Sequence, residues 1–198
     1  MTPRRVAAIL LAAGESRRMG KPKPLLDWQG TNLIEYQIAQ LRAAGCDPLI
    51  AVLGHGAADV AVPAGGAGAV VAVNEGYRAG RASSLRTGAN AIDAADAIVV
   101  LSVDQPRPAA VIRRLIDEHA GGVTMPAHGG RRGHPVVLDG ALLGELRAAR
   151  EETEGLRAIV GRQPAREVTF DTAIVLLDLN TPEEYEEASR IFASEVPQ

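Results

Sequence analysis

Residues 6–23 read VAAILLAAGESRRMGKPK, and this stretch decides how the chain is expected to fold. Its apolar part, residues 6–11, has the length and composition of one buried strand. The strand runs directly into a loop of small residues that contains Gly14 and Gly20. In α/β proteins such a loop leaves a parallel strand at the carboxyl edge of the sheet, where free backbone N–H groups can bind phosphate. The stretch therefore predicts an anion site directly after the first strand.

Outward from this stretch, short apolar runs alternate with amphipathic segments along the whole chain. This alternation is typical of βα units that build a mainly parallel sheet. We predict a single domain over residues 1–198, an α/β three-layer αβα sandwich with a mainly parallel, Rossmann-like sheet. Strands are expected at residues 6–11, 49–53, 70–73, 98–103, 122–125, 136–138 and 174–178.

Helix signals lie between these strands. Asn32, with a glutamate three residues later, predicts a capped helix that ends before Gly45. A second helix is expected over residues 108–119. The last is expected to begin at Thr181, where a proline and a second capping box follow. The only loose tract is expected at residues 61–69.

Composition and charge exclude several classes of function. Hydrophobic residues make up 46% of the 198 residues and charged residues 23%, so global disorder is excluded. Aromatic residues make up only 3%, too few for a base-stacking platform, and a net charge of -3 gives no overall basic field for nucleic acid. The apolar run at residues 6–13 is too short for a membrane span or a signal peptide. We therefore expect a cytoplasmic protein that binds neither nucleic acid nor membrane.

The first 26 residues differ from the rest of the chain in charge. They contain six basic residues and one acidic residue, which gives a local charge of +5. The chain's only two lysines, Lys21 and Lys23, both lie here, and a lysine ammonium is a compact point charge. This charge predicts that a small anion is bound at one place.

Two familiar phosphate-binding loops do not fit residues 12–23. A Walker A loop has four residues between its glycines and then Lys-Ser/Thr, whereas Gly14 and Gly20 enclose five residues and Pro22 follows Lys21. A dinucleotide fingerprint opens straight into a helix, which the prolines of this segment disfavour.

The stretch instead resembles the L-A-A-G-x-S-x-R-M-G-x-x-K signature of nucleotidyltransferases with a glycosyltransferase-A-like fold. Within that group, the chain is similar to the MobA/MocA-like molybdenum cofactor cytidylyltransferases. The resemblance implies that the loop backbone contacts the nucleotide and that two cations, Arg18 and Lys23, hold its triphosphate and act in catalysis. The signature positions are filled by Leu11, Ala12, Ala13, Gly14, Ser16, Arg18, Met19, Gly20 and Lys23.

A metal site is expected after the fourth predicted strand. Asp104 begins an Asp-Gln-Pro sequence at the carboxyl end of that strand, and Mg²⁺ prefers one or two carboxylates together with phosphate oxygens. An Asx turn before the following helix would also explain this residue. The resemblance implies that Asp104 acts in catalysis by binding Mg²⁺. It also implies a second metal contact from Asp178 or Asn180, and Asn180 alternatively orients Thr181 at the helix cap.

Two further segments carry the resemblance to the same family. Asn74, Ser83 and Ser84 belong to its N…G-x-x-S-S-L segment, associated with nucleotide and acceptor binding, although capping of a helix explains the serines as well. Arg81 stands where the family usually has an apolar residue. His134 lies in a Gly-His-Pro sequence that the resemblance places on the pterin side of the cleft.

The function implied by the resemblance is transfer of CMP from CTP to the terminal phosphate of molybdopterin cofactor, with release of pyrophosphate. Ala13 favours CTP, because guanylyl relatives typically carry a glycine there. The alternatives are guanylyl transfer, a sugar-phosphate nucleotidyltransferase of the same fold, and a non-catalytic carrier that hands molybdopterin to a molybdoenzyme or its chaperone. The presence of Asp104 favours an enzyme over a carrier.

Overall fold

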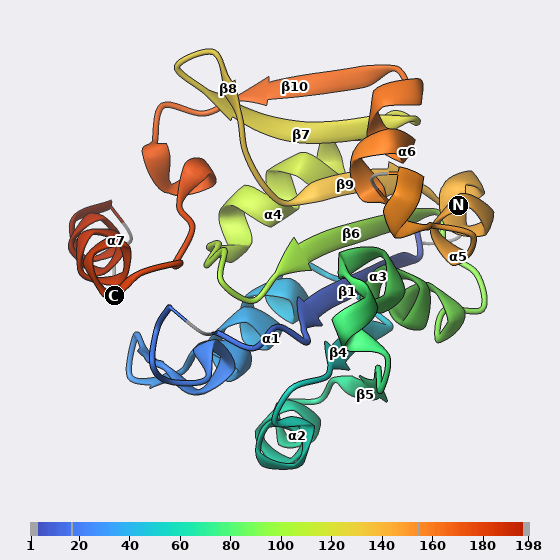
Figure 1. Ribbon diagram of the computed structural model, residues 1–198. Coiled ribbons are helices and arrows are strands. Elements are labelled where there is room, and N and C mark those ends of the chain that lie inside the picture. Colours follow the sequence, from blue (N-terminus) through green and yellow to red (C-terminus); the bar gives the residue numbers. More distant parts are fainter. Residues whose placement is uncertain (1–3, 17, 154, 196–198) are drawn as a thin grey trace.

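The computed structural model describes residues 4–16, 18–153 and 155–195, and one twisted sheet forms its centre (Figure 1). The strands are β1 (Val6–Ala12), β4 (Leu49–Leu53), β5 (Val70–Val73), β6 (Ala97–Ser102), β7 (Val123–His128), β8 (Arg131–Arg132), β9 (Val136–Asp139) and β10 (Ala165–Thr169). Their order is β10-β7-β9-β6-β1-β4-β5, with β8 paired only to β7. Neighbours run parallel except at β8 and β9, which pair antiparallel. The mainly parallel sheet expected from the sequence is confirmed.

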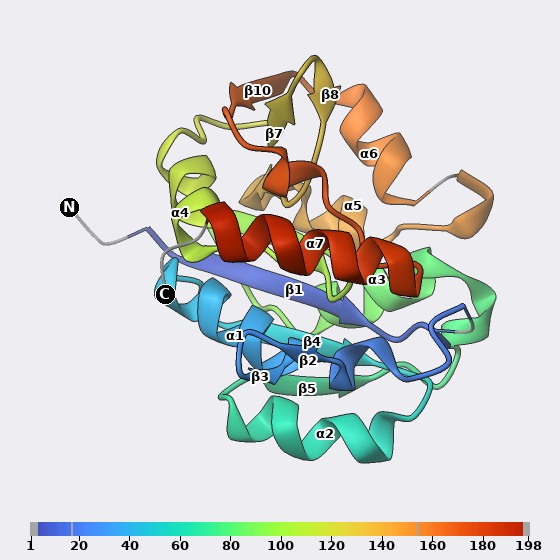
Figure 2. The same cartoon turned by 90° about the vertical axis from the view of Figure 1, so that its left-hand side faces the viewer.

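Helices cover both faces of this sheet. The four on one face are α1 (Leu33–Ala43), α2 (Ala57–Gly66), α4 (Ala109–Asp117) and α7 (Pro182–Glu195), and the three on the other are α3 (Arg81–Asn90), α5 (Leu143–Arg147) and α6 (Leu156–Arg162). Figure 2 looks onto α7, which lies along the first face. Side chains of β1 alternate between the two cores, with Ala8 and Leu10 in one and Ala7 and Ile9 in the other. The three-layer α/β sandwich is therefore confirmed.

The predicted helix starts at Asn32 and Thr181 are also confirmed. Asn32 Oδ1 accepts a hydrogen bond of 3.0 Å from the backbone N–H of Glu35, three residues on. At α7, the N–H of Glu184 donates to Thr181 Oγ1 (3.3 Å), and the N–H of Thr181 donates to Glu184 Oε2 (3.2 Å). These reciprocal bonds satisfy N–H groups that the helix itself leaves without partners.

The prediction of a strand at residues 174–178 is wrong. The chain there forms a 3-10 helix, Ala173–Leu176, followed by an extended residue. The carbonyl oxygens of Val175 and Leu177 accept hydrogen bonds from the buried guanidinium of Arg107 (2.9 and 3.0 Å), so they are not paired with a strand. β10 occupies the edge of the sheet instead, and its largely exposed sequence has no apolar run to indicate a strand.

The loose tract expected at residues 61–69 is also wrong, because α2 covers most of it. Val60 and Ala64, one turn apart, are buried in the core. This packing outweighs the poor helix propensity of Pro63 and the glycines that follow it.

The register of the sheet brings three strand ends to one edge. Leu11 in β1 lies opposite Ser102 in β6, and Ala12 lies opposite Leu53 in β4. Loops that leave these strands therefore meet at the carboxyl edge of the sheet, which is where open α/β sheets bind ligands.

Candidate active site

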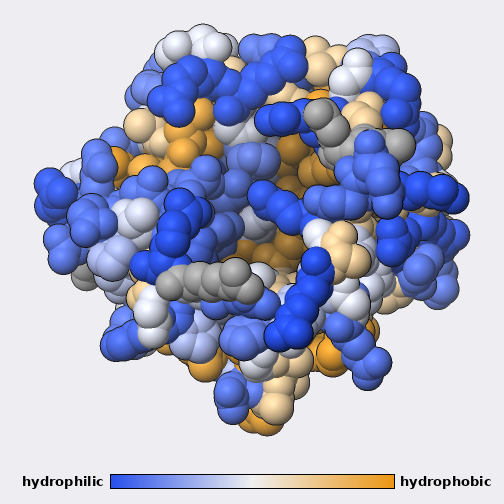
Figure 3. Space-filling view, viewed as in Figure 1, coloured by the Kyte–Doolittle hydropathy of each residue, from blue (hydrophilic) through white to orange (hydrophobic). Residues whose placement is uncertain are grey.

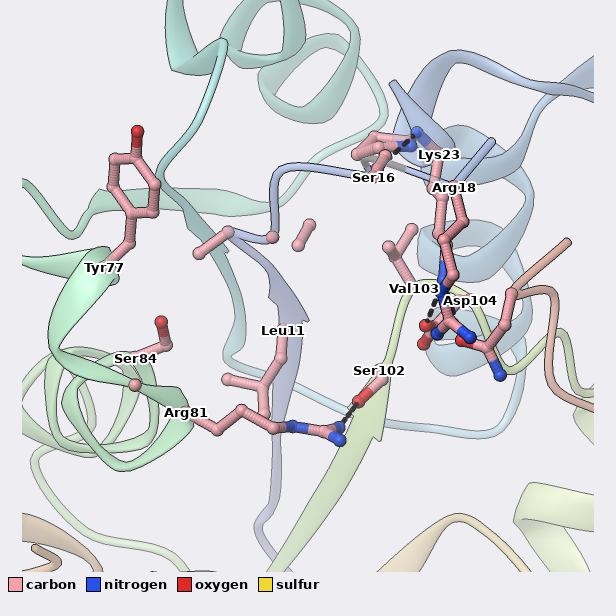
Figure 4. Close-up of a pocket in the computed structure, with 16 residues that line it drawn as sticks. Leu11, Ser16, Arg18, Lys23, Tyr77, Arg81, Ser84, Ser102, Val103 and Asp104 are labelled. Carbon is pink, nitrogen blue, oxygen red and sulfur yellow. Dashed lines mark hydrogen bonds and ion pairs between the residues drawn. The ribbon is translucent and has the colours of Figure 1, made fainter. Parts of the chain in front are cut away.

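A cavity of about 360 Å³ opens at the carboxyl ends of β1 and β6 (Figure 4). Its wall is formed by the loop after β1, the start of α3, the chain after β6 and the chain before α7. The structure therefore brings together segments separated by more than 150 residues. Of the residues expected from the sequence, the wall contains Leu11, Ala12, Ala13, Gly14, Ser16, Arg18, Lys23, Ser84, Asp104 and Asn180.

The loop after β1 folds back on itself through Ser16. The Ser16 backbone has φ +53°, a left-handed conformation that is uncommon outside glycine. Its carbonyl accepts from the N–H of Met19 (3.0 Å), and its hydroxyl accepts from the N–H of Lys23 (3.0 Å). Gly14 is exposed, and a Cβ built there would meet no atom within 4 Å. An anion can therefore approach the backbone of this loop closely.

The side chain of Lys23 gathers two oxygen atoms from distant parts of the chain. Its Nζ donates to Asp104 Oδ2 at 2.7 Å and to Asn180 Oδ1 at 3.0 Å (Figure 4). The Lys23 side chain is only 13% exposed and that of Asp104 24%, so this ion pair is better shielded from water than a surface pair. One carboxylate and one amide oxygen that converge on a single cation are ligands that suit Mg²⁺, which completes its shell with phosphate oxygens and water. The donor set therefore fits the metal implied by the family.

Asp178, the other candidate metal ligand, does not line this cavity. Its Oδ1 accepts a hydrogen bond of 2.8 Å from Gln105 Nε2, and its side chain is exposed. Of the two candidates for the second metal contact, Asp178 and Asn180, the structure therefore places only Asn180 on the cavity wall.

A buried guanidinium lies behind these carboxylates. Arg107 is fully buried and donates to the carbonyl oxygens of Pro106 (2.7 Å) and His134 (2.8 Å), besides those of Val175 and Leu177. Burial lowers the pKa of Arg107 to about 9, against the opposing effect of nearby carboxylates. Because this pKa is still above 7, the group keeps its charge. Arg107 thereby fixes the segment that leads to α7 against the segment that follows β6.

Asn74 and Ser83 are not on the wall of the first cavity. Asn74 is buried and donates to the hydroxyls of Ser83 (2.8 Å) and Ser84 (3.0 Å), so it holds the start of α3 in place. Only Ser84 of these three lines the cavity. Neither serine accepts a hydrogen bond from an N–H at the α3 N-terminus; instead Glu151 Oε2 accepts one from the N–H of Ala82 (2.8 Å).

A second cavity of about 600 Å³ adjoins the first and contains His134. It lies between α3 and α6, over the end of β6, the middle of β7 and the start of β9. Figure 3 shows this face of the molecule hollowed, with hydrophobic residues on the floor of the hollow. Burial first, and then the charge of Arg107, lower the pKa of His134. His134 is therefore neutral at pH 7 and can both donate and accept a hydrogen bond.

Part of the positive charge counted at the amino terminus lies far from the loop. Arg4 Nη1 donates to the carbonyl oxygens of Ile116 and His119, beyond the start of β1. A seven-residue strand is about 20 Å long, so Arg4 and Arg5 sit at the opposite edge of the sheet. Arg17 lies outside the described residues. The charge available at the described part of the loop therefore comes from Arg18 and Lys23, and Lys21 is exposed outside the cavity wall.

Six described residues of the first cavity were not assigned to the site from the sequence: Pro24, Tyr77, Gly80, Arg81, Ser102 and Val103. Tyr77 lies on a short 3-10 helix before α3, Ser102 ends β6, and Arg81 begins α3. Arg81 could have been found, because it replaces an apolar residue expected there. Ser102 has no sequence signal of its own, since the register of β6 against β1 places it at the cavity, and Tyr77 is placed there by the 3-10 helix that precedes α3.

Comparison with known proteins gives this arrangement a class. Residues 8–168 match the MobA-like NTP transferase domain. The chain belongs to this family, and a solved nucleotidyl transferase structure has the same mainly parallel α/β fold. The match ends before Asn180, so the second oxygen that contacts Lys23 lies outside the matched residues.

Individual relatives have several different names. The chain is 31% identical over 169 residues to nicotine blue oxidoreductase of Paenarthrobacter nicotinovorans, covering 80% of this chain and 83% of that one. It is 22% identical to the molybdenum cofactor cytidylyltransferase of Escherichia coli, over 91% of this chain and 93% of that one. Among solved structures, Rv0371c of Mycobacterium tuberculosis has 32% identity and a TM-score of 0.83, covering 96% of this chain and 100% of that one. A cytidylyltransferase and an oxidoreductase thus both appear among its relatives.

Proposed function

We propose that this protein transfers CMP from CTP to the terminal phosphate of the molybdopterin form of the molybdenum cofactor and releases pyrophosphate. The observation that carries the proposal is the convergence of Lys23, Asp104 and Asn180 beside the loop after β1. Their convergence supplies a cation and two oxygen ligands where a triphosphate on the loop would end. The cytidylyltransferase among the relatives supports the same reaction.

The chain's residues perform three tasks in this reaction. The loop backbone at residues 12–14 positions the nucleotide, while Arg18 and Lys23 bind the negative triphosphate. When bound by Asp104 and Asn180, Mg²⁺ would neutralise charge that develops on the leaving pyrophosphate. The acceptor is a phosphate monoester, which is largely ionised at pH 7, so the reaction needs no general base from the protein. Alignment of the two anions is therefore the protein's main contribution.

The base preference is assigned to the loop that contains Ala13. The carbonyl oxygen of Ala13 accepts a hydrogen bond of 3.1 Å from the N–H of His55, so the loop is fixed against the chain that follows β4. A methyl group on a fixed backbone narrows the pocket, which favours a pyrimidine over the larger purine. One methyl-sized change contributes only about 1–3 kcal/mol of discrimination, so polar contacts to the base supply the remainder.

The proposal is tested by incubating the protein with molybdopterin cofactor, Mg²⁺ and each of the four nucleoside triphosphates, with pyrophosphate release and product mass as readouts. CTP should exceed GTP by about tenfold or more in kcat/KM, and Ala13→Gly should reduce that ratio. Preference for GTP would contradict the cytidylyl assignment but leave transferase activity standing. Cofactor binding without pyrophosphate release would support the carrier alternative.

The oxidoreductase among the relatives requires a parallel incubation. Here NADH and an electron-accepting dye replace the nucleoside triphosphate, and NADH oxidation is followed by absorbance. Oxidation of NADH together with no pyrophosphate release from any triphosphate would overturn the proposed function.

A further inference from the structure

Arg81 stands at the boundary between the two cavities. Among the described residues, it is the only charged one that lines both of them, and the cavities share only Leu11 and Ser102 besides. Its Nη2 donates to Ser102 Oγ at 2.6 Å, and Ser102 is 7% exposed (Figure 4). Arg81 is thus a cation at the rim whose guanidinium is held in place by a buried hydroxyl.

The second cavity has the character of a site for an anion with an apolar body. Leu85, Met125 and Val136 are among the apolar side chains of its wall, which agrees with the apolar floor visible in Figure 3. Two more guanidinium groups belong to the wall, those of Arg157 and of Arg132, whose Nε also donates to Glu167 at 2.7 Å. Its one acidic wall residue among those described, Glu151, already accepts the N–H of Ala82 at the α3 N-terminus.

Charge repulsion is the main physical obstacle at the boundary between the cavities. Two like charges in contact repel each other several times more strongly at the effective dielectric of a protein surface than in bulk water. When an acceptor phosphate approaches the α-phosphate of a nucleotide, each negative charge of one phosphate repels each negative charge of the other. A guanidinium has several donors in a fixed plane and can bind an oxygen of each phosphate at once.

We infer that Arg81 binds the phosphate of the acceptor and holds it against the α-phosphate of the nucleotide, so that Arg81 selects phosphorylated acceptors. The inference rests on the proposed transferase function. In that reaction an acceptor phosphate oxygen forms a bond to the α-phosphorus, and the bond from α-phosphorus to the bridging oxygen breaks. The pyrophosphate leaves with that electron pair, and no proton has to be removed from the ionised acceptor.

Binding of a simple probe tests the inference without catalysis. The protein is first saturated with a non-hydrolysable CTP analogue, and phenyl phosphate, inorganic phosphate or phenol is then titrated by calorimetry. Phenyl phosphate should bind about tenfold more weakly or worse to Arg81→Met, as expected for loss of a charge-assisted hydrogen bond. Binding of the CTP analogue should change less than about threefold. Phenol should bind weakly and equally to both proteins.

Arg131→Met is the matched control, because Arg131 is exposed, carries the same charge and lines neither cavity. It should leave phenyl phosphate binding unchanged. Arg81→Lys keeps the charge but loses the planar guanidinium, and Ser102→Ala removes the hydroxyl that holds the Arg81 guanidinium in place. Both variants should show an intermediate loss of phenyl phosphate affinity and an unchanged melting temperature. These two variants keep the test decisive if Arg81→Met is unstable.

Three outcomes would overturn the inference. Phenyl phosphate binding equally to wild type and to the folded Arg81 variants would remove Arg81 from the acceptor site. Loss of the CTP analogue in place of phenyl phosphate would make Arg81 a nucleotide-binding residue. An equal loss of phenyl phosphate affinity in Arg131→Met would show that the effect comes from the net charge of the protein and not from the position of Arg81. Absence of pyrophosphate release alongside Arg81-dependent phenyl phosphate binding would count against the proposed function only.

Discussion

Replacement of Lys23 by methionine is expected to have opposite effects on metal binding and on turnover. Methionine keeps most of the length and packing of lysine but removes the ammonium group. That ammonium lies between Asp104 and Asn180, at 2.7 and 3.0 Å from their oxygen atoms. A divalent cation must therefore displace it to reach the same oxygens. Lys23→Met removes this competitor and should strengthen metal binding to the free protein.

The size of the effect follows from the shielding of the Lys23–Asp104 pair. With side chains 13% and 24% exposed, the pair is closer to a charge-assisted hydrogen bond than to a surface ion pair. Such a bond contributes about 1.5–3 kcal/mol, and the lower figure corresponds to about tenfold in a dissociation constant. Turnover with CTP should fall by about 10²- to 10³-fold, as for other losses of one charge contact to a transition state.

Metal affinity is measured with Mn²⁺ by electron paramagnetic resonance without nucleotide, and turnover by pyrophosphate release. Lys21→Met is the control, since Lys21 is exposed and outside the cavity wall; it should change Mn²⁺ affinity by less than about twofold, the effect of a distant screened charge. Unchanged or weaker Mn²⁺ binding in Lys23→Met, with the fold intact, would refute the idea that lysine and metal compete for these oxygens.

Three further outcomes are expected. Asp104→Asn should abolish metal-dependent turnover while the CTP analogue still binds, and Asn180→Ala should cost much less; equal losses in steady-state kinetics would contradict this order. Gly54→Ala places a Cβ 2.8 Å from the Cβ and the carbonyl oxygen of Ala13. It should lower the free energy of unfolding in urea by about 1–3 kcal/mol and weaken binding of the CTP analogue. An unchanged affinity for the analogue would show that the loop can move freely. Burial lowers the pKa of His134, so as pH falls below about 6.5 the unfolded chain binds the proton before the folded protein does. The free energy of unfolding should therefore decrease from about pH 6.5 toward about pH 5, and should decrease less steeply in His134→Asn. Equal pH dependence of stability in the two proteins would show that this histidine is not the cause.

The parts of the fold that could be predicted are those where local and tertiary signals agree. The capped helix after Asn32 has a side-chain cap and a consistently buried face, so its start follows from the sequence. Residues 174–178 are apolar like a strand, but their carbonyls bond to Arg107, which is almost 70 residues away. Helix α2 was missed for the converse reason, since packing against the sheet decides it over its weak propensity. Distant side chains and sheet contacts are not visible in a local pattern.

In the candidate site, too, residues with a local sequence signal could be located, and residues placed only by contacts distant in sequence could not. The loop after β1 and Asp104 could be located because each follows a recognisable strand, and their convergence follows from parallel pairing. The hydrogen bonds of Asn74 could not be predicted, because they depend on the turn that precedes α3. Arg81 was visible as a departure from the family pattern. Its partner Ser102 is defined only by the sheet register.

The buried guanidinium of Arg107 bears on where a shortened version of this protein could end. The match to the family model stops at residue 168, yet Nη2 of Arg107 donates to two carbonyl oxygens beyond it, and the ring centroid of Phe192 lies 5.0 Å from that of Trp28. A chain cut at residue 168 would leave the buried guanidinium of Arg107 without two of its acceptors, which lowers the free energy of unfolding by about 1–3 kcal/mol or more. It would also expose the surface that Phe192 covers, which lowers that free energy by about 1.5–3 kcal/mol. Against a total stability of about 5–15 kcal/mol for a domain, these losses are large. The end of the family-model match is therefore not the end of the unit that folds, and a protein truncated at that point would lack part of its own core.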